Sequence, residues 1–278
     1  MSKSTAMSVV QQQTQKQQMQ KPEPHFELIP LPNLSHGGLV MHRGSGQYHL
    51  DNPNATFFSQ YHQEDVIVRL LPGRPPPGGR FFVEVGGFDG ERFSNSLYFE
   101  RSLGWDGLLV EANPYAYEKL LSRGRRAYSV KACLGKAEHL SFLLAGDMTV
   151  AQEHRSDYHA SKVRKMISSL RGDSNATASR ADAEPGATVK ATCTPLAALL
   201  AAVPGMASPA RVDLMVLDVE GAELDVLQSL DWDALDIRMF MVEVLQHRDY
   251  ISALLRSKGY VLAHSGQIDD FYVKKRRF

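Results

Sequence analysis

The stretch at 81–111 constrains the fold of this chain more than any other. An apolar run at 81–85 predicts a short buried strand of a parallel sheet. It leads into Gly-Gly-Phe-Asp-Gly at 86–90, where glycine permits positive φ angles and a close approach of a ligand to the backbone. A helix is expected over 94–103, and a second apolar run at 107–111 ends on a glutamate. Strand, glycine turn, helix and acid-ended strand are the layout of a nucleotide-binding βαβ unit.

The charges in this unit favour S-adenosylmethionine over a dinucleotide. Gly90 and Glu111 are spaced like a cofactor loop and the acid that holds the ribose hydroxyls. The G-x-G-x-x-G pattern of dinucleotide folds is absent, and the carboxylate of Asp89 would repel a pyrophosphate. S-adenosylmethionine carries an ammonium and a sulfonium, which the carboxylates of Glu84 and Asp89 suit. A nicotinamide-dependent oxidoreductase is therefore disfavoured.

Acidic residues end several of the predicted strands. Ligands of an open parallel sheet bind beyond the carboxyl ends of the strands, so these acids should surround one site. Glycine backbone would meet the methionine part, while Glu111 and Asn113 would meet the ribose. Cys133 either lines the adenine side or simply ends its strand. The candidate cofactor-binding residues are Glu84, Gly86, Gly87, Asp89, Gly90, Glu111, Asn113, Cys133 and Asp218.

Two longer blocks, 81–114 and 214–232, carry a resemblance to a known family. The sequence resembles the FkbM-type methyltransferases, including the related domain of the arthropod Star proteins. The resemblance implies an α/β fold, namely a Rossmann-like class I methyltransferase with a mostly parallel seven-stranded sheet and helices on both faces. It also implies S-adenosylmethionine as cofactor and, usually, a hydroxyl oxygen as methyl acceptor. Shorter matching segments lie at 58–60, 64–65, 132–135 and 194–196.

The resemblance supplies no catalytic residue, so the candidates follow from position. Methyl transfer is an in-line displacement at carbon, and much of its catalysis is positioning. A hydroxyl acceptor with a high pKa also needs a base or a metal. Asp218, Glu220 or His247 could be the base. Alternatively, Asp218, Glu220 and Glu243 could hold a divalent cation through oxygen ligands.

The chain divides into three parts. Residues 1–24 are glutamine-rich and are expected to be disordered. Residues 25–80 form a lead-in, where the helical period over 56–71 predicts either a lid on the pocket or a packing helix. Residues 81–278 form the Rossmann-like domain. Its insertion at about 147–187 is a mobile lid, a substrate-recognition element or a solvated segment.

Two local patterns in the domain support narrower predictions. His154, Asp157 and His159 are metal-ligating residue types, but their spacing fixes no geometry, and no metal site is assigned to them. Thr194 is predicted to cap a helix, with Pro195 at the first helical position.

Composition excludes several classes of protein. Lysine and arginine together number 31, as do aspartate and glutamate, so no net charge favours nucleic acid or an anionic membrane. No apolar run reaches the roughly 20 residues that span a bilayer, and the first residues show no signal-peptide core. A cytoplasmic location is therefore expected, with Cys133 and Cys193 as reduced core thiols.

The sequence thus predicts an S-adenosylmethionine-dependent methyltransferase that acts on a small molecule or a glycan. The rival interpretation is a non-catalytic, Star-like interaction module that keeps the fold. The intact acids and glycines favour the enzyme, because a non-catalytic module has no physical need for them.

Overall fold

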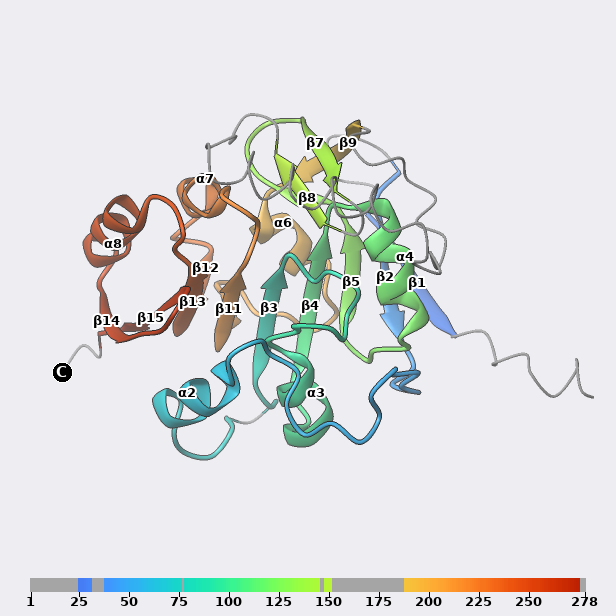
Figure 1. The fold of residues 1–278 in the computed structure, drawn as a ribbon, viewed down its shortest axis with the longest axis horizontal. Coiled ribbons are helices and arrows are strands. Elements are labelled where there is room, and N and C mark those ends of the chain that lie inside the picture. Colours follow the sequence, from blue (N-terminus) through green and yellow to red (C-terminus); the bar gives the residue numbers. More distant parts are fainter. Residues whose placement is uncertain (1–24, 32–37, 77, 146–147, 152–187, 276–278) are drawn as a thin grey trace, which may run out of the picture.

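The computed structural model describes residues 25–31, 38–76, 78–145, 148–151 and 188–275, and it has an α/β fold built on one large sheet (Figure 1). The predicted disordered tail at 1–24 and most of the predicted insertion, with its three metal-type residues, lie outside this description. The strands of the large sheet are β1 (Phe26–Pro30), β2 (Val40–Gly44), β3 (Phe81–Val85), β4 (Asp106–Glu111), β5 (Tyr128–Lys131), β11 (Leu214–Leu217), β13 (Met239–Glu243), β14 (Tyr260–Ser265) and β15 (Asp269–Lys274).

The described residues place nine strands in this sheet, in the order β1-β2-β5-β4-β3-β11-β13-β15-β14. The four pairings from β5 to β13 are parallel. Two antiparallel pairings flank them at each end. The prediction of a seven-stranded, mostly parallel sheet was therefore wrong. β1 and β2, from the lead-in, extend the sheet beyond β5, and Figure 1 shows them at the opposite end from β14 and β15.

Helices cover both faces of the large sheet, as predicted, and the described residues place three on each face. Side chains alternate along each strand, so Phe82 packs with one set of helices and Val83 with the other. The first set is α2 (Gln63–Leu70), α3 (Leu97–Leu103) and α4 (Pro114–Ser122). The second set is α6 (Leu196–Ala201), α7 (Glu223–Ser229) and α8 (Arg248–Ser257).

The helix predicted over 56–71 is shorter than expected. α2 begins at Gln63, after His62 in the left-handed region with φ 57°. Its Ile67 is fully buried against the sheet beside Phe82. α2 thus packs on the sheet through Ile67, and the predicted role as a lid on the pocket stays a prediction.

The remaining strands form two smaller sheets. β10 (Ala210–Val212) pairs with β12 (Leu235–Ile237). The other small sheet has the order β6-β9-β7-β8 and follows directly after β5. Its strands are β6 (Cys133–Leu134), β7 (His139–Ala145), β8 (Met148–Ala151) and β9 (Thr188–Thr194).

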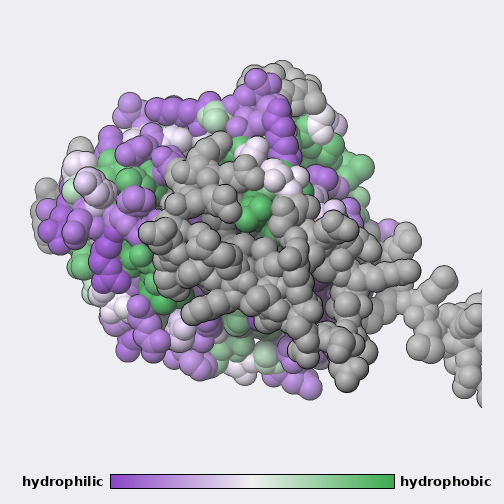
Figure 2. Space-filling view, turned by 45° about the horizontal axis from the view of Figure 1, so that its top comes forward, coloured by the Kyte–Doolittle hydropathy of each residue, from purple (hydrophilic) through white to green (hydrophobic). Residues whose placement is uncertain are grey.

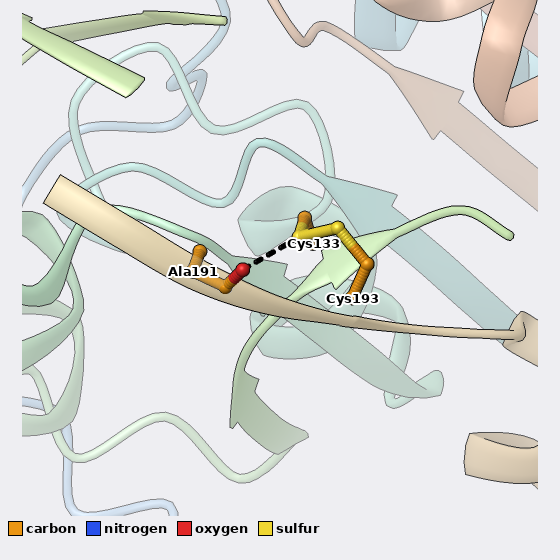
Figure 3. Close-up of a disulfide and its surroundings, with 3 residues drawn as sticks. All are labelled: Cys133, Ala191 and Cys193. Atoms are coloured by element: carbon orange, nitrogen blue, oxygen red, sulfur yellow. Dashed lines mark hydrogen bonds between the residues drawn. A yellow bond between two sulfur atoms is a disulfide. The ribbon is translucent and has the colours of Figure 1, made fainter. Parts of the chain in front are cut away.

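A disulfide joins Cys133 to Cys193 in this small sheet (Figure 3). The prediction of two reduced thiols was therefore wrong. β6 and β9 pair in parallel with the two cysteines as register partners, and their Cα atoms are 4.3 Å apart. The cysteines are 60 residues apart in the chain, so only strand pairing brings them together. Cys133 Sγ also lies 3.6 Å from the carbonyl oxygen of Ala191.

The predicted helix cap at Thr194 was also wrong. β9 continues through Thr194, and the N-cap position of α6 is Pro195, without a side-chain cap bond. The Thr194 hydroxyl is buried and has no hydrogen-bond partner among the described residues.

The surface of the described part shows mixed hydropathy. Figure 2 shows hydrophobic side chains in separate small patches among hydrophilic ones on the face turned to the viewer. Among the described residues, no helix has the length and apolar character needed to cross a bilayer.

Candidate active site

The carboxyl ends of β3, β4 and β11 meet at a tight glycine turn. The N–H groups of Gly86 and Gly87 both donate to the carbonyl oxygen of Val110, at 2.9 and 3.1 Å. Gly86 has φ +87°, and a Cβ atom at this position would lie 1.8 Å from the carbonyl oxygen of Asp218. The turn therefore runs between the ends of β4 and β11 with no room for a side chain at Gly86.

Glu111, the last residue of β4, holds the inner side of this turn. Its Oε2 accepts the N–H of Phe88 at 2.8 Å, and its Oε1 accepts the N–H of Asn113 at 2.7 Å. Burial raises the pKa of Glu111 to about 7, although backbone donors from Asn113, Phe88 and Ala112 lower it. Each carboxylate oxygen has a second lone pair, so Glu111 can accept further hydrogen bonds from a ligand.

Glu84 is held by the segment that leads into α3. It accepts the N–H of Asn95 at 2.7 Å and the hydroxyls of Ser94 and Ser96 at 3.0 and 2.5 Å. Burial raises the pKa of Glu84, and the charge of Arg125 opposes that effect. Glu84 therefore shapes the loop around the site, and its predicted contact with the methionine ammonium stays a prediction.

Asp89 also has protein partners for both carboxylate oxygens. Oδ1 accepts the N–H groups of Glu91 and Arg92 at 2.9 and 2.7 Å. Oδ2 lies 3.1 Å from the guanidinium of Arg123. The charge that argued against a pyrophosphate is thus paired within the protein, and its predicted role toward the cofactor stays untested.

Two arginines that the sequence interpretation missed hold the outer side of the turn. Arg125 is buried, donates to the carbonyl oxygen of Gly90 at 2.7 Å, and pairs with Glu100 at 2.9 Å. Arg123 pairs with Asp89 and, at 3.0 Å, with Glu91. Nothing in the local sequence pattern marks these arginines, because their partners lie at least 25 residues earlier in the chain.

Asn113 is the N-cap of α4. Its side-chain oxygen accepts the N–H groups of Tyr115 and Ala116, at 3.0 and 3.4 Å. Pro114 occupies the first helical position, which suits its fixed φ and missing donor. Asn113 is fully buried. It therefore positions α4 beside Glu111, and its predicted contact with the ribose stays a prediction.

Gly87 and Gly90 lie against α4. A Cβ atom on either glycine would lie 3.1 Å from a side-chain carbon of Leu120. The glycines thus allow α4 to pack closely on the turn.

The loop between β11 and α7 supplies the predicted bases Asp218 and Glu220. Both are partly exposed, and Glu220 has a positive φ of 52°. The sequence interpretation missed Glu223, which is buried and accepts the N–H groups of Val219 and Gly221 at 3.0 and 3.1 Å. Glu223 thus fixes the loop that carries Asp218 and Glu220.

The other candidates lie further along the same edge. Glu243 is buried at the end of β13, beside β15. His247 is exposed just before α8, with its ring 6.3 Å from that of Tyr250. The structure does not bring the predicted cation ligands into a metal-like cluster, since no group of three or more His, Cys, Asp or Glu among the described residues could hold a metal ion.

A comparison with protein-family models decides the family. The model described as "Methyltransferase FkbM domain" matches residues 84–262, well over half of the chain. The chain belongs to the FkbM methyltransferase family. The expected methyltransferase activity is thereby confirmed at the level of the family, which implies the use of S-adenosylmethionine.

Comparisons with individual proteins add little to this assignment. A search of curated proteins found no match. Among solved structures, the human methyltransferase 10 domain containing protein is 10% identical with a TM-score of 0.35, over 75% of this chain and 77% of that chain. Mitomycin 7-O-methyltransferase MmcR is 10% identical with a TM-score of 0.29, over 72% of this chain and 50% of that chain. Likenesses this low carry no argument about substrate.

Proposed function

We propose that this FkbM methyltransferase transfers a methyl group from S-adenosylmethionine to a hydroxyl oxygen of a small molecule or glycan. The observation that carries the proposal is Glu111, a buried carboxylate held against a glycine turn at the carboxyl edge of the sheet. Glu111 would accept the ribose hydroxyls, and the backbone of Gly86 and Gly87 would lie against the methionine part. S-adenosylmethionine, when bound, supplies an electrophilic methyl group.

Asp218 is the best supported of the three predicted bases. Its carbonyl oxygen lies against Gly86, so its side chain begins beside the turn where the methyl group would sit. Glu220 follows in the same loop, whereas His247 lies at the start of α8, beyond β13. We therefore propose Asp218 as the residue that accepts the acceptor proton, with Glu220 as the alternative.

The first test is calorimetric titration with S-adenosylhomocysteine. Glu111→Ala should weaken binding about a hundredfold, because two charge-assisted hydrogen bonds of about 1.5 kcal/mol each are lost. Glu118→Gln is the matched control, since Glu118 is exposed on α4 and should leave the affinity unchanged. No binding to the folded wild-type protein would instead favour the Star-like interaction module. Equal affinities for wild type and Glu111→Ala would show that the ribose lies elsewhere.

The affinity for S-adenosylhomocysteine should also depend on pH. The pKa of Glu111 is about 7 in the free protein, and only the ionised carboxylate accepts both ribose hydroxyls. Binding therefore lowers this pKa and releases a proton, so affinity should rise as the pH rises through 7. From pH 6 to pH 8 the ionised fraction of Glu111, and with it the affinity, should increase about tenfold. Glu111→Gln should abolish the slope, and a slope that persists in this variant would assign it to another group.

The disulfide is informative about the cellular compartment in which the protein folds. Disulfides persist in oxidising compartments and are rare in the cytosol. We therefore propose folding in an oxidising compartment, in place of the predicted cytoplasmic location. A count of free thiols in protein isolated from its native source, under conditions that block exchange, would test this: no free thiol is expected, and two free thiols would restore the cytoplasmic prediction.

A further inference from the structure

Asp269, the first residue of β15, is a buried carboxylate with one unused oxygen. Its side chain is 3% exposed. Oδ2 accepts a hydrogen bond from Nε2 of Gln63 at 2.8 Å. Oδ1 is buried and has no hydrogen-bond partner among the described residues. A buried carboxylate oxygen left unpaired is costly, so this atom calls for a donor from a ligand.

Asp269 lies at the same edge of the sheet as the proposed cofactor site. It is the register partner of Glu243, the last residue of β13. Met241 on β13 and Phe271 on β15 both pack in the cluster that contains α2. Because side chains alternate along a strand, Glu243 and Asp269 project from this same face. Register partners in an antiparallel pair have Cβ atoms about 5 Å apart, so the two carboxyl groups are neighbours.

Asp269 lies too far from the glycine turn to hold the cofactor. The sheet order places β11 and β13 between β3 and β15. Three interstrand steps of about 4.8 Å put Asp269 about 14 Å from the strand that carries the turn. A group that reaches Asp269 along this edge would therefore belong to the far part of the methyl acceptor.

Gln63 fixes the orientation of this carboxylate. Its own Oε1 accepts the N–H of Tyr61 at 2.8 Å, so its Nε2 must point toward Asp269. Its backbone N–H donates to the hydroxyl of Ser59 at 3.0 Å, and Glu64 accepts the N–H of Ser59 at 2.9 Å. Gln63 and Asp269 come from segments 206 residues apart, and both lie outside the stretch that the family model matches.

We infer that Asp269, oriented by Gln63, accepts a hydrogen bond from a second hydroxyl of a neutral polyhydroxyl methyl acceptor. This inference rests on the proposed function. Burial and the charge of Asp270 together raise the pKa of Asp269 to about 6, against the lowering effect of the hydrogen bond from Gln63, so the group is ionised at neutral pH. An ionised oxygen accepts from a hydroxyl and repels an anionic acceptor.

The test compares Asp269→Asn with Asp270→Asn. Asparagine has the same shape as aspartate, and its side-chain oxygen can still accept the hydrogen bond from Gln63. Asp269→Asn therefore removes the negative charge of the side chain and keeps the contact with Gln63. Asp270 is equally buried but bonds Ser265 and Tyr272 on the opposite face, which makes it the matched control. Wild type is first screened with radiolabelled S-adenosylmethionine against monosaccharides, methyl glycosides and inositols.

With an acceptor from this panel, Asp269→Asn should raise KM and lower kcat/KM 10- to 100-fold, because a charge-assisted hydrogen bond is lost. Its affinity for S-adenosylhomocysteine should change less than twofold, and Asp270→Asn should keep kcat/KM near wild type. A kcat/KM within threefold of wild type in Asp269→Asn would overturn the inference.

If wild type methylates no compound of the panel, the proposed function fails independently of the inference about Asp269. The role of Asp269 is then tested by a measurement that needs no turnover. The carbon-13 carboxyl signal of Asp269 is titrated with S-adenosylhomocysteine bound, with and without each panel compound. A bound hydroxyl would lower the titration midpoint, because it stabilises the carboxylate. An unchanged midpoint with every compound would refute the role given to Asp269.

Discussion

Gly86→Ala is expected to lower the free energy of unfolding by on the order of 4 kcal/mol. A left-handed backbone at a non-glycine residue costs about 1–2 kcal/mol. Overpacking adds about 1–3 kcal/mol. Here the new Cβ would overlap the Asp218 carbonyl oxygen at 1.8 Å, and that atom is backbone, which cannot rotate away. The end of β11 must therefore move from the glycine turn.

Gly104→Ala is the matched control for this prediction. Gly104 also has a positive φ, of 68°, but nothing lies within 4 Å of a Cβ atom at that position. It should therefore show the backbone strain alone. Urea unfolding gives the free energy of unfolding of each variant. The extra loss in Gly86→Ala over Gly104→Ala measures the cost of the clash with the Asp218 carbonyl oxygen. Equal losses of stability would mean that β11 is not packed against the turn as described. The same Gly86→Ala protein, if folded, should also lose affinity for S-adenosylhomocysteine.

The double variant Cys133→Ala/Cys193→Ala should lose about 4 kcal/mol of stability, because the disulfide closes a loop of 60 residues. The bond crosslinks β6 to β9, which share only two residue pairs in their ladder. Without the bond, β6 would be held to β9 mainly by that short ladder, whereas β7 and β9 share five residue pairs. Guanidinium unfolding of the oxidised wild type and the double variant measures the difference.

A reducing agent supplies the control for the disulfide. It should lower the unfolding midpoint of wild type toward that of the double variant, and it should leave the double variant unchanged. Identical midpoints for wild type with and without reductant would show that the bond does not stabilise the fold. Because β6 follows β5 on the expected adenine side, the reduced protein should also bind S-adenosylhomocysteine more weakly.

Local sequence pattern was enough to predict the strand, turn and strand at the centre of the candidate site. The apolar run at 81–85, the glycines at 86–90 and the acid at Glu111 predict strand, turn and strand, and the structure has them in those places. Such features are visible in sequence because burial and backbone conformation act over a few residues. A parallel strand must be apolar on both faces, and a positive φ favours glycine.

The partners of the charged side chains could not be predicted in this way. Glu84 and Asp89 looked available for a ligand, yet each is paired within the protein, Asp89 with Arg123. These pairings depend on which loops meet at the sheet edge. A carboxylate at a strand end has the same sequence signature whether it faces a ligand or a neighbouring loop.

The sequence by itself determined the α/β class, the glycine turn and the acid beside it, because these follow from local periodicity and backbone freedom. Only the tertiary structure decided the addition of β1 and β2 to the sheet, the Cys133–Cys193 bond and the contact of Gln63 with Asp269. Each of these joins segments far apart in the chain. Their formation depends on strand order and register, which the packing of the whole sheet sets.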